Sequence, residues 1–207
     1  MENLEKEEPV LSIQKAKIKD HFLTAEYTVV ENEVMTKYTA EFMRFVHEDL
    51  LQRFQYLVVH LCLITEQVRI STVCQMMDLM LAEVEISVNK QGNLEEELLA
   101  PSTYEVARVR QALFDEKLYD LVCFTNFRCT GFVNSNSGVM LIGQKVLKSG
   151  KVLNLLTPLT SLEESDYEFA NILAMDLKMA YNEVIAHING KGTGGQLLDL
   201  FNQEEAA

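Results

Sequence analysis

The sequence predicts an α+β protein in which helices pack on one face of an antiparallel sheet. The first observation is the stretch Leu121–Thr160, where two turn signals separate three runs rich in Val, Leu, Ile, Phe and Thr. Such runs are typical of strands, so we expect a three-stranded antiparallel meander here. The second observation is an N-terminal hairpin, and the third is a pair of long apolar stripes with helical spacing. Strands and helices do not alternate strictly, which disfavours a parallel sheet.

The length and composition of the chain fit one domain. Its 207 residues are 48% apolar, enough to form a core. We expect a single domain over residues 1–190, with an inserted segment at about 70–119, and a flexible C-terminal tail at 191–207. The longest apolar run, Leu57–Ile64, is too short to cross a bilayer, and the acidic N-terminus is unlike a secretory signal. The expected location is therefore the cytoplasm, without contact with a membrane.

The N-terminal region is predicted to form a hairpin that leads into a helix. Ser12–Val30 is expected to be one strand with a bend near Asp20 and His21, and Val34–Phe42 to be the second strand. An apolar stripe with three- and four-residue spacing then predicts a helix over His47–Gln67.

The inserted segment is predicted to contain a strand and a further helix. Apolar and polar residues alternate over Ala82–Asn89, which favours a strand with one solvent-exposed face. Gly92 marks a turn, and Ser102 with Glu105 forms a capping-box pattern that would begin a helix.

A long helix is expected after the meander. Ser165 and Glu168 form another capping-box pattern, and an apolar stripe predicts a helix over Asp166–Asn189. Gly190 is placed to end this helix, because glycine readily adopts the left-handed conformation of a helix C-terminus.

The meander is basic within an acidic chain. It contains four cations and no Asp or Glu, so it carries +4, while the whole chain carries −13 and the other residues therefore −17. On the predicted strand Val122–Val133, Phe124 and Phe132 flank Arg128 on one face. Single-stranded nucleic acid binds such surfaces, because rings stack on bases and cations follow the phosphates. The candidate nucleic-acid-binding residues are Lys15, Lys17, Lys19, Phe124, Arg128, Phe132, Lys145, Lys148 and Lys151.

A competing interpretation assigns these side chains no binding role. In it, Phe124 and Phe132 are core residues and the lysines form an ordinary solvated face. The acidic balance of the chain also disfavours a protein that coats duplex DNA through bulk charge.

The C-terminal tail is similar to a docking peptide. Gln196, Leu197, Leu200 and Phe201 follow a glycine-rich linker, and they resemble the short peptide by which bacterial and phage replication proteins bind the DNA polymerase sliding clamp. This resemblance implies the clamp as a partner. The alternative is a last amphipathic turn that folds back on the body of the protein.

The sequence contains no recognisable catalytic or metal-binding pattern. The cysteines, Cys62, Cys74, Cys123 and Cys129, lack the spacing of metal ligands, and no phosphate-binding loop or Ser/His/Asp set is present. His60 lies in an apolar helical run and is expected to be a core residue. We therefore expect a protein that is not an enzyme and that uses neither a cofactor nor a metal.

Three segments carry a resemblance to a known group of proteins. They are KAKIKDHFLTAEYTVV at 15–30, VHEDL at 46–50 and TGFVNSNSGVMLIGQKVLKSGKVLNLLTP at 130–158. They resemble an uncharacterised family of small proteins of phages and mobile elements from gut bacteria, whose members commonly end in a glutamine-led apolar tail. The order of sheet and helix is also similar to the Whirly and positive-coactivator type of single-stranded DNA-binding fold.

These resemblances and the basic meander lead to one expectation and one alternative. The expectation is a single-stranded DNA-binding or replication and recombination accessory protein of a phage or mobile element, acting in the cytoplasm of its bacterial host. The alternative is a protein-interaction adaptor or inhibitor that acts through its acidic surface and C-terminal peptide. The sequence leaves the oligomeric state open, a homo-oligomer included.

Overall fold

A computed structural model of the chain describes residues 10–32, 34–91, 118, 123–163 and 167–191, with only the backbone described over 81–91. The predicted capping box at Ser102 and Glu105, the turn at Gly92 and residues 192–207 of the predicted tail lie outside these residues. Lys191, the first residue of that predicted tail, is described and forms ion pairs with Asp49 and Glu183. In the part of the chain that is described, no helix is long and apolar enough to cross a membrane.

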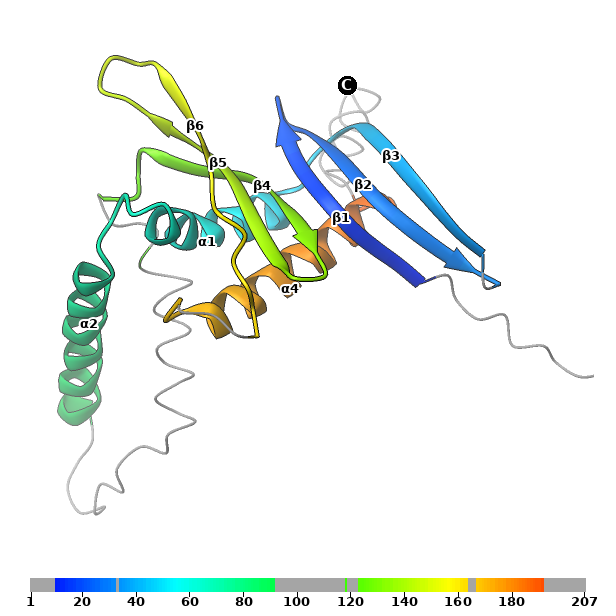
Figure 1. The fold of residues 1–207 in the computed structure, drawn as a ribbon. Helices are drawn as coiled ribbons and strands as arrows, with labels where there is room; N and C mark the ends of the chain where they lie inside the picture. The colour runs from blue at the N-terminus through cyan, green and yellow to red at the C-terminus, as the bar shows by residue number, and fades with distance from the viewer. Residues whose placement is uncertain (1–9, 33, 92–117, 119–122, 164–166, 192–207) are drawn as a thin grey trace, which may run out of the picture.

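The architecture is one six-stranded sheet with helices, which confirms the α+β class and the C-terminal meander (Figure 1). The strand order is β3-β2-β1-β4-β5-β6, and every neighbouring pair is antiparallel. The elements are β1 (Val10–Lys19), β2 (Phe22–Glu31), β3 (Val34–Phe45), α1 (Glu48–Ile64), α2 (Ile70–Gln91), β4 (Phe127–Ser135), β5 (Gly138–Val146), β6 (Val152–Leu156) and α4 (Ala170–Ile188).

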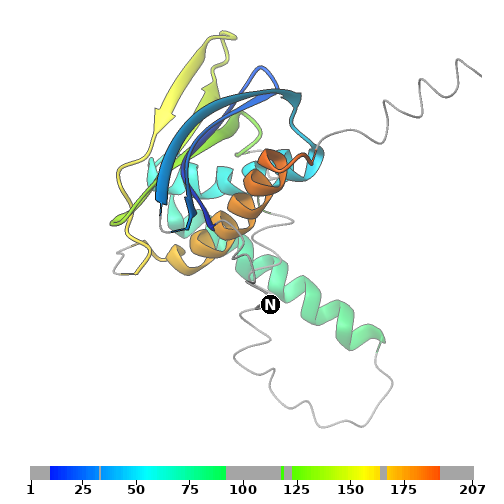
Figure 2. The same ribbon diagram turned by 90° about the vertical axis from the view of Figure 1, so that its right-hand side faces the viewer.

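The same order of elements occurs twice in this sheet. Three strands and then a helix, β1–β3 with α1, are followed later by β4–β6 with α4. The two units join through the pairing of β1 with β4, and α1 packs against β4 and β5 while α4 packs against β1 and α1. Both helices lie on the same side of the curved sheet (Figures 1 and 2). Each unit therefore contributes a helix that contacts strands of the other unit.

The predicted N-terminal hairpin is in fact a three-stranded meander. The expected bend at Asp20 and His21 is a complete chain reversal, so the segment predicted as a single strand is β1 and β2. Both turn residues have positive φ, 49° and 69°. That backbone suits the two-residue turns of hairpins, and short polar or imidazole side chains adopt it more readily than branched ones do.

The helix α1 forms close to the predicted bounds, but the predicted strand Ala82–Asn89 is wrong. That segment belongs to α2, which runs without a break to Gln91. Apolar residues at Val84 and Val88 are four positions apart, so the pattern that suggests a strand also fits a helix.

The final helix begins later than predicted. α4 starts at Ala170, with Phe169 at the N-cap position and no side chain bonded to the helix end. Glu168 instead lies in the turn before the helix, where its carboxylate accepts a contact from the Cys74 thiol at 3.8 Å. Ser165 lies outside the described residues, but a helix that starts at Ala170 does not begin at a capping box of Ser165 and Glu168. Gly190 does follow the helix end, with φ of +111° and its N–H donating to the His187 carbonyl.

The hydrophobic core lies between the sheet and the two long helices. Phe54 and Leu57 of α1, Leu173 of α4, and Phe132 and Leu141 of the sheet are all at most 2% exposed. The burial of such large apolar side chains is the main force that holds the helices on the sheet.

At Gly143 of β5 the helix α1 approaches the sheet closely. A Cβ atom at this position would overlap the side chain of Leu61 and the carbonyl oxygen of Arg128. Glycine thus lets the fully buried Leu61 rest directly on the strand.

Candidate nucleic-acid interface

The two faces of the sheet differ in what covers them. α1 and α4 lie against one face, the inner face, and no described helix lies against the other, the outer face. Ala16 pairs with Phe132, and both are buried on the inner face. Because successive strand side chains alternate between faces, Lys15, Lys17 and Lys19 of β1 lie on the outer face.

The two aromatic rings predicted to stack on bases are not accessible. Phe124 and Phe132 are each 1% exposed, and the ring of Phe132 meets that of Phe54 at a centroid distance of 6.0 Å. The register of β4 against β5 shifts between Cys129 and Gly131, where the strand has a β-bulge. This bulge adds a residue and so reverses the alternation, which moves Phe132 to the inner face. The prediction of an exposed ring on each side of Arg128 is therefore wrong.

Lys145 also departs from the predicted surface. It pairs with the buried Phe127, and its ammonium nitrogen lies 4.9 Å from the centroid of that ring. The same nitrogen donates to the Gln67 side-chain oxygen at 2.9 Å. Lys145 thus belongs to the inner side of the sheet and contacts the segment that follows α1.

Lys15 is on the outer face, but an acidic neighbour balances its charge. Its ammonium group lies 2.7 Å from a carboxylate oxygen of Glu26 on β2. Both side chains are partly exposed, so this pair contributes little to stability. It does reduce the attraction that Lys15 would exert on a phosphate.

The remaining predicted cations gather at one end of the sheet. In an antiparallel sheet of this order, β1, β3 and β5 end where β2, β4 and β6 begin, so the β1–β2 turn and the β5–β6 turn lie at the same end (Figure 1). None of these cations forms an ion pair with a described residue, and all are exposed. We call this group the basic end: Lys17, Lys19, Arg128, Lys148 and Lys151.

An aromatic pair of one exposed and one half-buried ring, which the sequence patterns do not indicate, lies beside the basic end. Phe22 and Phe45 stack with ring centroids 5.2 Å apart, and the ring of His21 meets Phe45 edge-on at 6.3 Å. Phe45 is 54% exposed, and Phe22 pairs directly with Lys19. These rings are 23 positions apart in the sequence, and only the pairing of β2 with β3 brings them together.

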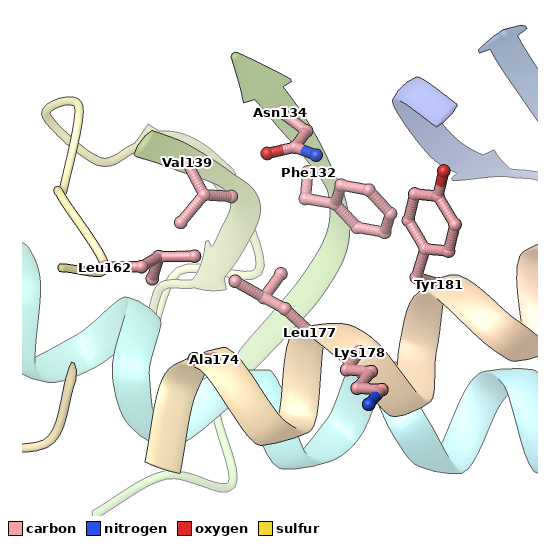
Figure 3. Close-up of a pocket in the computed structure, with 8 residues that line it drawn as sticks. All are labelled: Phe132, Asn134, Val139, Leu162, Ala174, Leu177, Lys178 and Tyr181. Carbon is pink, nitrogen blue, oxygen red and sulfur yellow. The ribbon is translucent and has the colours of Figure 1, made fainter. Parts of the chain in front are cut away.

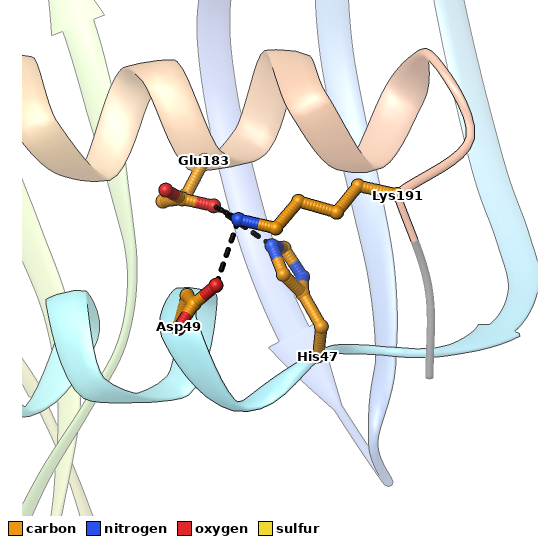
Figure 4. A network of polar contacts seen from close by, with 4 residues as sticks. All are labelled: His47, Asp49, Glu183 and Lys191. Atoms are coloured by element: carbon orange, nitrogen blue, oxygen red, sulfur yellow. Dashed lines mark hydrogen bonds and ion pairs between the residues drawn. The ribbon is translucent and has the colours of Figure 1, made fainter. Parts of the chain in front are cut away.

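A second polar cluster joins the start of α1 to the end of α4 (Figure 4). The ammonium group of Lys191 lies 2.8 Å from Asp49 and 2.6 Å from Glu183, and Glu183 also contacts the His47 ring at 2.8 Å. The ligand atoms of His47, Asp49 and Glu183 lie within 4.8 Å of one another, a spacing that suits a metal ion. The positive charge of Lys191 lies between Asp49 and Glu183, so the protein itself partly neutralises the negative charge of the two carboxylates.

Charge pairing also shifts the protonation equilibria of this cluster. The hydrogen bond from Lys191 is the main reason that the pKa of Asp49 is lowered, and the bonds to Asp49 and Glu183 raise the pKa of Lys191. For Glu183, burial acts to raise the pKa, but the bonds from Lys191 and His47 outweigh it and the net shift is downward. All three groups therefore stay charged more readily than they would alone.

A buried network centres on His60 of α1. Its Nδ1 lies 2.8 Å from the Tyr167 hydroxyl, and its Nε2 lies 3.1 Å from a carboxylate oxygen of Asp176 on α4. His60 and Asp176 are at most 1% exposed. Burial, followed by the negative charge of Asp176, raises the pKa of Tyr167. The residue types suit acid–base chemistry, but their enclosure favours a role in joining the two helices. The expectation that His60 is a core residue is confirmed.

The four cysteines are free thiols. Burial raises the pKa of Cys62 and of Cys129 to about 12, so both stay protonated and unreactive near neutral pH.

A cavity of about 250 Å³ lies between the second half of the sheet and α4 (Figure 3). Phe132, Val139, Leu162 and Leu177 form its apolar wall. At its margin the Tyr181 hydroxyl accepts a hydrogen bond from a backbone N–H of β1 at 2.7 Å, so this side chain ties α4 to the sheet. Of the polar side chains that line the cavity, Tyr181 thus helps to hold the fold, and Asn134 and Lys178 complete the lining.

Comparisons with protein-family models, with curated proteins and with solved structures found no match to this chain. The resemblance to phage and mobile-element proteins therefore stays a prediction that rests on the sequence segments given above.

Proposed function

We propose that this protein binds single-stranded DNA as a replication or recombination accessory factor of a phage or mobile element, in the cytoplasm of a bacterial host. The observation that carries the proposal is the basic end with its adjacent aromatic pair. Five exposed cations without protein partners among the described residues stand beside the stacked rings of Phe22 and Phe45. Cations that follow phosphates, next to rings that stack on bases, are what a single-stranded site requires.

The arrangement favours a single strand over a duplex. The aromatic pair can stack only on bases that are not already paired, whereas a duplex offers its backbone alone to such a surface. The overall charge of −13 also repels a long duplex laid along the body of the protein, while a short strand can contact the basic end alone. We therefore place Lys17, Lys19, Arg128, Lys148 and Lys151 on the phosphates, and Phe22 and Phe45 on the bases.

The test is a fluorescence anisotropy titration of labelled single- and double-stranded oligonucleotides with the full chain. We expect tighter binding of the single strand. Replacing Lys19→Gln with Arg128→Gln should weaken this binding at least tenfold, since two charged contacts are lost. The control Lys178→Gln removes an exposed cation of α4 near Asn134 and Val139, at the opposite end of β4 and β5, and should leave the affinity nearly unchanged.

A separate variant tests the aromatic pair. Phe45→Leu keeps an apolar side chain of similar size but removes the ring, so it should weaken binding by about tenfold, the usual effect of losing one base stack. Equal affinity of Phe45→Leu and the unaltered protein would exclude stacking at this site. If neither oligonucleotide binds, the adaptor interpretation replaces this proposal.

We also propose the DNA polymerase sliding clamp as a partner of the C-terminal tail. The support is the resemblance of Gln196, Leu197, Leu200 and Phe201 to the clamp-binding peptide, together with the glycine-rich linker that precedes them.

A further inference from the structure

The edge strand β3 has the properties of an interface rather than of a protected edge. It is 12 residues long, contains no proline, and has β2 as its only strand partner among the described residues. Five of its large apolar side chains are 45–81% exposed: Val34, Met35, Tyr38, Met43 and Phe45. The opposite edge strand, β6, has only five residues. Long edge strands with exposed apolar side chains can pair with another strand, and proteins usually shorten or shield such edges.

The register of the β2–β3 hairpin determines which backbone groups of β3 are free. Glu31 pairs with Val34 across a two-residue loop, and such a closing pair exchanges both of its backbone hydrogen bonds. Bonded pairs then recur at every second residue, so Thr36, Tyr38 and Ala40 direct their N–H and C=O groups to β2. The residues between them direct theirs to the free edge: Met35, Lys37, Thr39 and Glu41.

The charges along this free edge are self-complementary. If two copies of β3 pair antiparallel about Thr39, Lys37 of each copy lies opposite Glu41 of the other, and Met35 lies opposite Met43. Shifting the centre of this pairing by one residue places each charge opposite a neutral residue. Within one chain, the partners of Lys37 and Glu41 on β2 are the neutral Thr28 and Thr24. Neither side chain forms an ion pair with another described residue, so in this pairing a second copy would supply the opposite charge.

We propose that two copies of this chain form a dimer through β3, with an antiparallel pairing centred on Thr39. Such an interface is isologous, because the same strand serves both subunits. It joins the two sheets into one and keeps their outer faces on the same side. The two Lys37–Glu41 pairs and the two Met35–Met43 pairs lie on that face, flanking the central threonines.

The test is sedimentation equilibrium of the full chain, without nucleic acid, over micromolar to near-millimolar concentrations. The mass should rise from 23.6 kDa towards twice that value. Lys37→Glu and Glu41→Lys should each shift the dissociation constant upward by about tenfold or more, because each places like charges opposite each other twice. An equimolar mixture of the two variants should dimerise again, since each then supplies the charge that the other needs.

Controls and a second type of variant keep the result unambiguous. The double variant Lys37→Glu with Glu41→Lys should dimerise like the unaltered protein, while Lys178→Glu and Glu163→Lys, which make the same charge changes on other exposed surfaces, should have no effect. Thr39→Pro removes an N–H that faces the free edge and not β2, so it should keep the fold, checked by circular dichroism, and abolish the dimer. A chain that stays monomeric, or a dimer that tolerates the single charge reversals, would overturn the proposal.

Discussion

The buried His187 makes a specific prediction about stability at mildly acidic pH. It is fully buried on α4 between the rings of Phe42 and His47. Burial is the main reason that its pKa is lowered to about 4, and the nearby charges of Arg44 and His47 act in the same direction. In the unfolded chain a histidine has a pKa of about 6.5. Between these two values the unfolded chain binds more protons than the folded protein.

The sign and the size of the effect follow from this difference. Stability rises with pH wherever the unfolded state binds more protons, so the contribution of His187 is complete above about pH 6.5 and is lost as the pH falls toward about 4. A shift of one pKa unit corresponds to about 1.4 kcal/mol. The loss should reach about 2 kcal/mol at about pH 5 and approach about 3 kcal/mol at about pH 4.

The assay is urea unfolding of the protein and of His187→Leu at several pH values between about 7.5 and about 4. Leucine has no proton to gain, so the unfolding free energy of the variant should fall less steeply with acid, by about 2 kcal/mol at about pH 5. The control His21→Gln also removes a histidine, but an exposed one. Parallel curves for the protein and His187→Leu would refute the reasoning.

Three further predictions concern the core, the close contact of α1 with Gly143 of β5, and the C-terminal tail. Phe132→Ala should lower the unfolding free energy by about 3–5 kcal/mol in urea melts, because the ring is a core side chain and not part of a binding face; a cost below about 1 kcal/mol would contradict this placement. Gly143→Ala should lower the thermal midpoint, because the added methyl group meets Leu61, and an unchanged midpoint would exclude the close approach. Leu200→Ala with Phe201→Ala should leave the midpoint nearly unchanged while removing binding to the sliding clamp, and a fall of several degrees would make the tail structural.

Local signals predict the meander well because they coincide with real chain reversals. Gly138 and Gly150 both have φ in the range that favours glycine, 149° and 78°, and they lie at the β4–β5 and β5–β6 turns, which separate the three strands of the predicted meander. Apolar spacing likewise predicts α1 and most of α4, since a buried stripe must recur every three to four residues. These features depend on neighbours in the sequence alone.

Features that depend on distant partners could not be predicted in this way. The bulge near Thr130 shifts the alternation of β4. A two-residue pattern in the sequence does not reveal where a bulge inserts an extra residue. The β1–β2 turn contains neither Gly, Asn nor Pro, so it carries no strong turn signal. The bulge puts Phe132 on the opposite face from the one that simple alternation predicts. The pair of Phe22 with Phe45 depends on a register shift between β2 and β3 and on β3 extending beyond Phe42, where the predicted strand ends.

The salt dependence of single-stranded DNA binding tests the central claim most directly. For single strands, the logarithm of the binding constant falls by about 0.7 per logarithmic unit of salt for each phosphate contact. Five contacts at the basic end therefore predict a slope of about −3.5, and Lys19→Gln with Arg128→Gln should reduce it to about −2. Binding that is absent at low salt, or a slope that this double variant leaves unchanged, would contradict a nucleic-acid interface at the basic end.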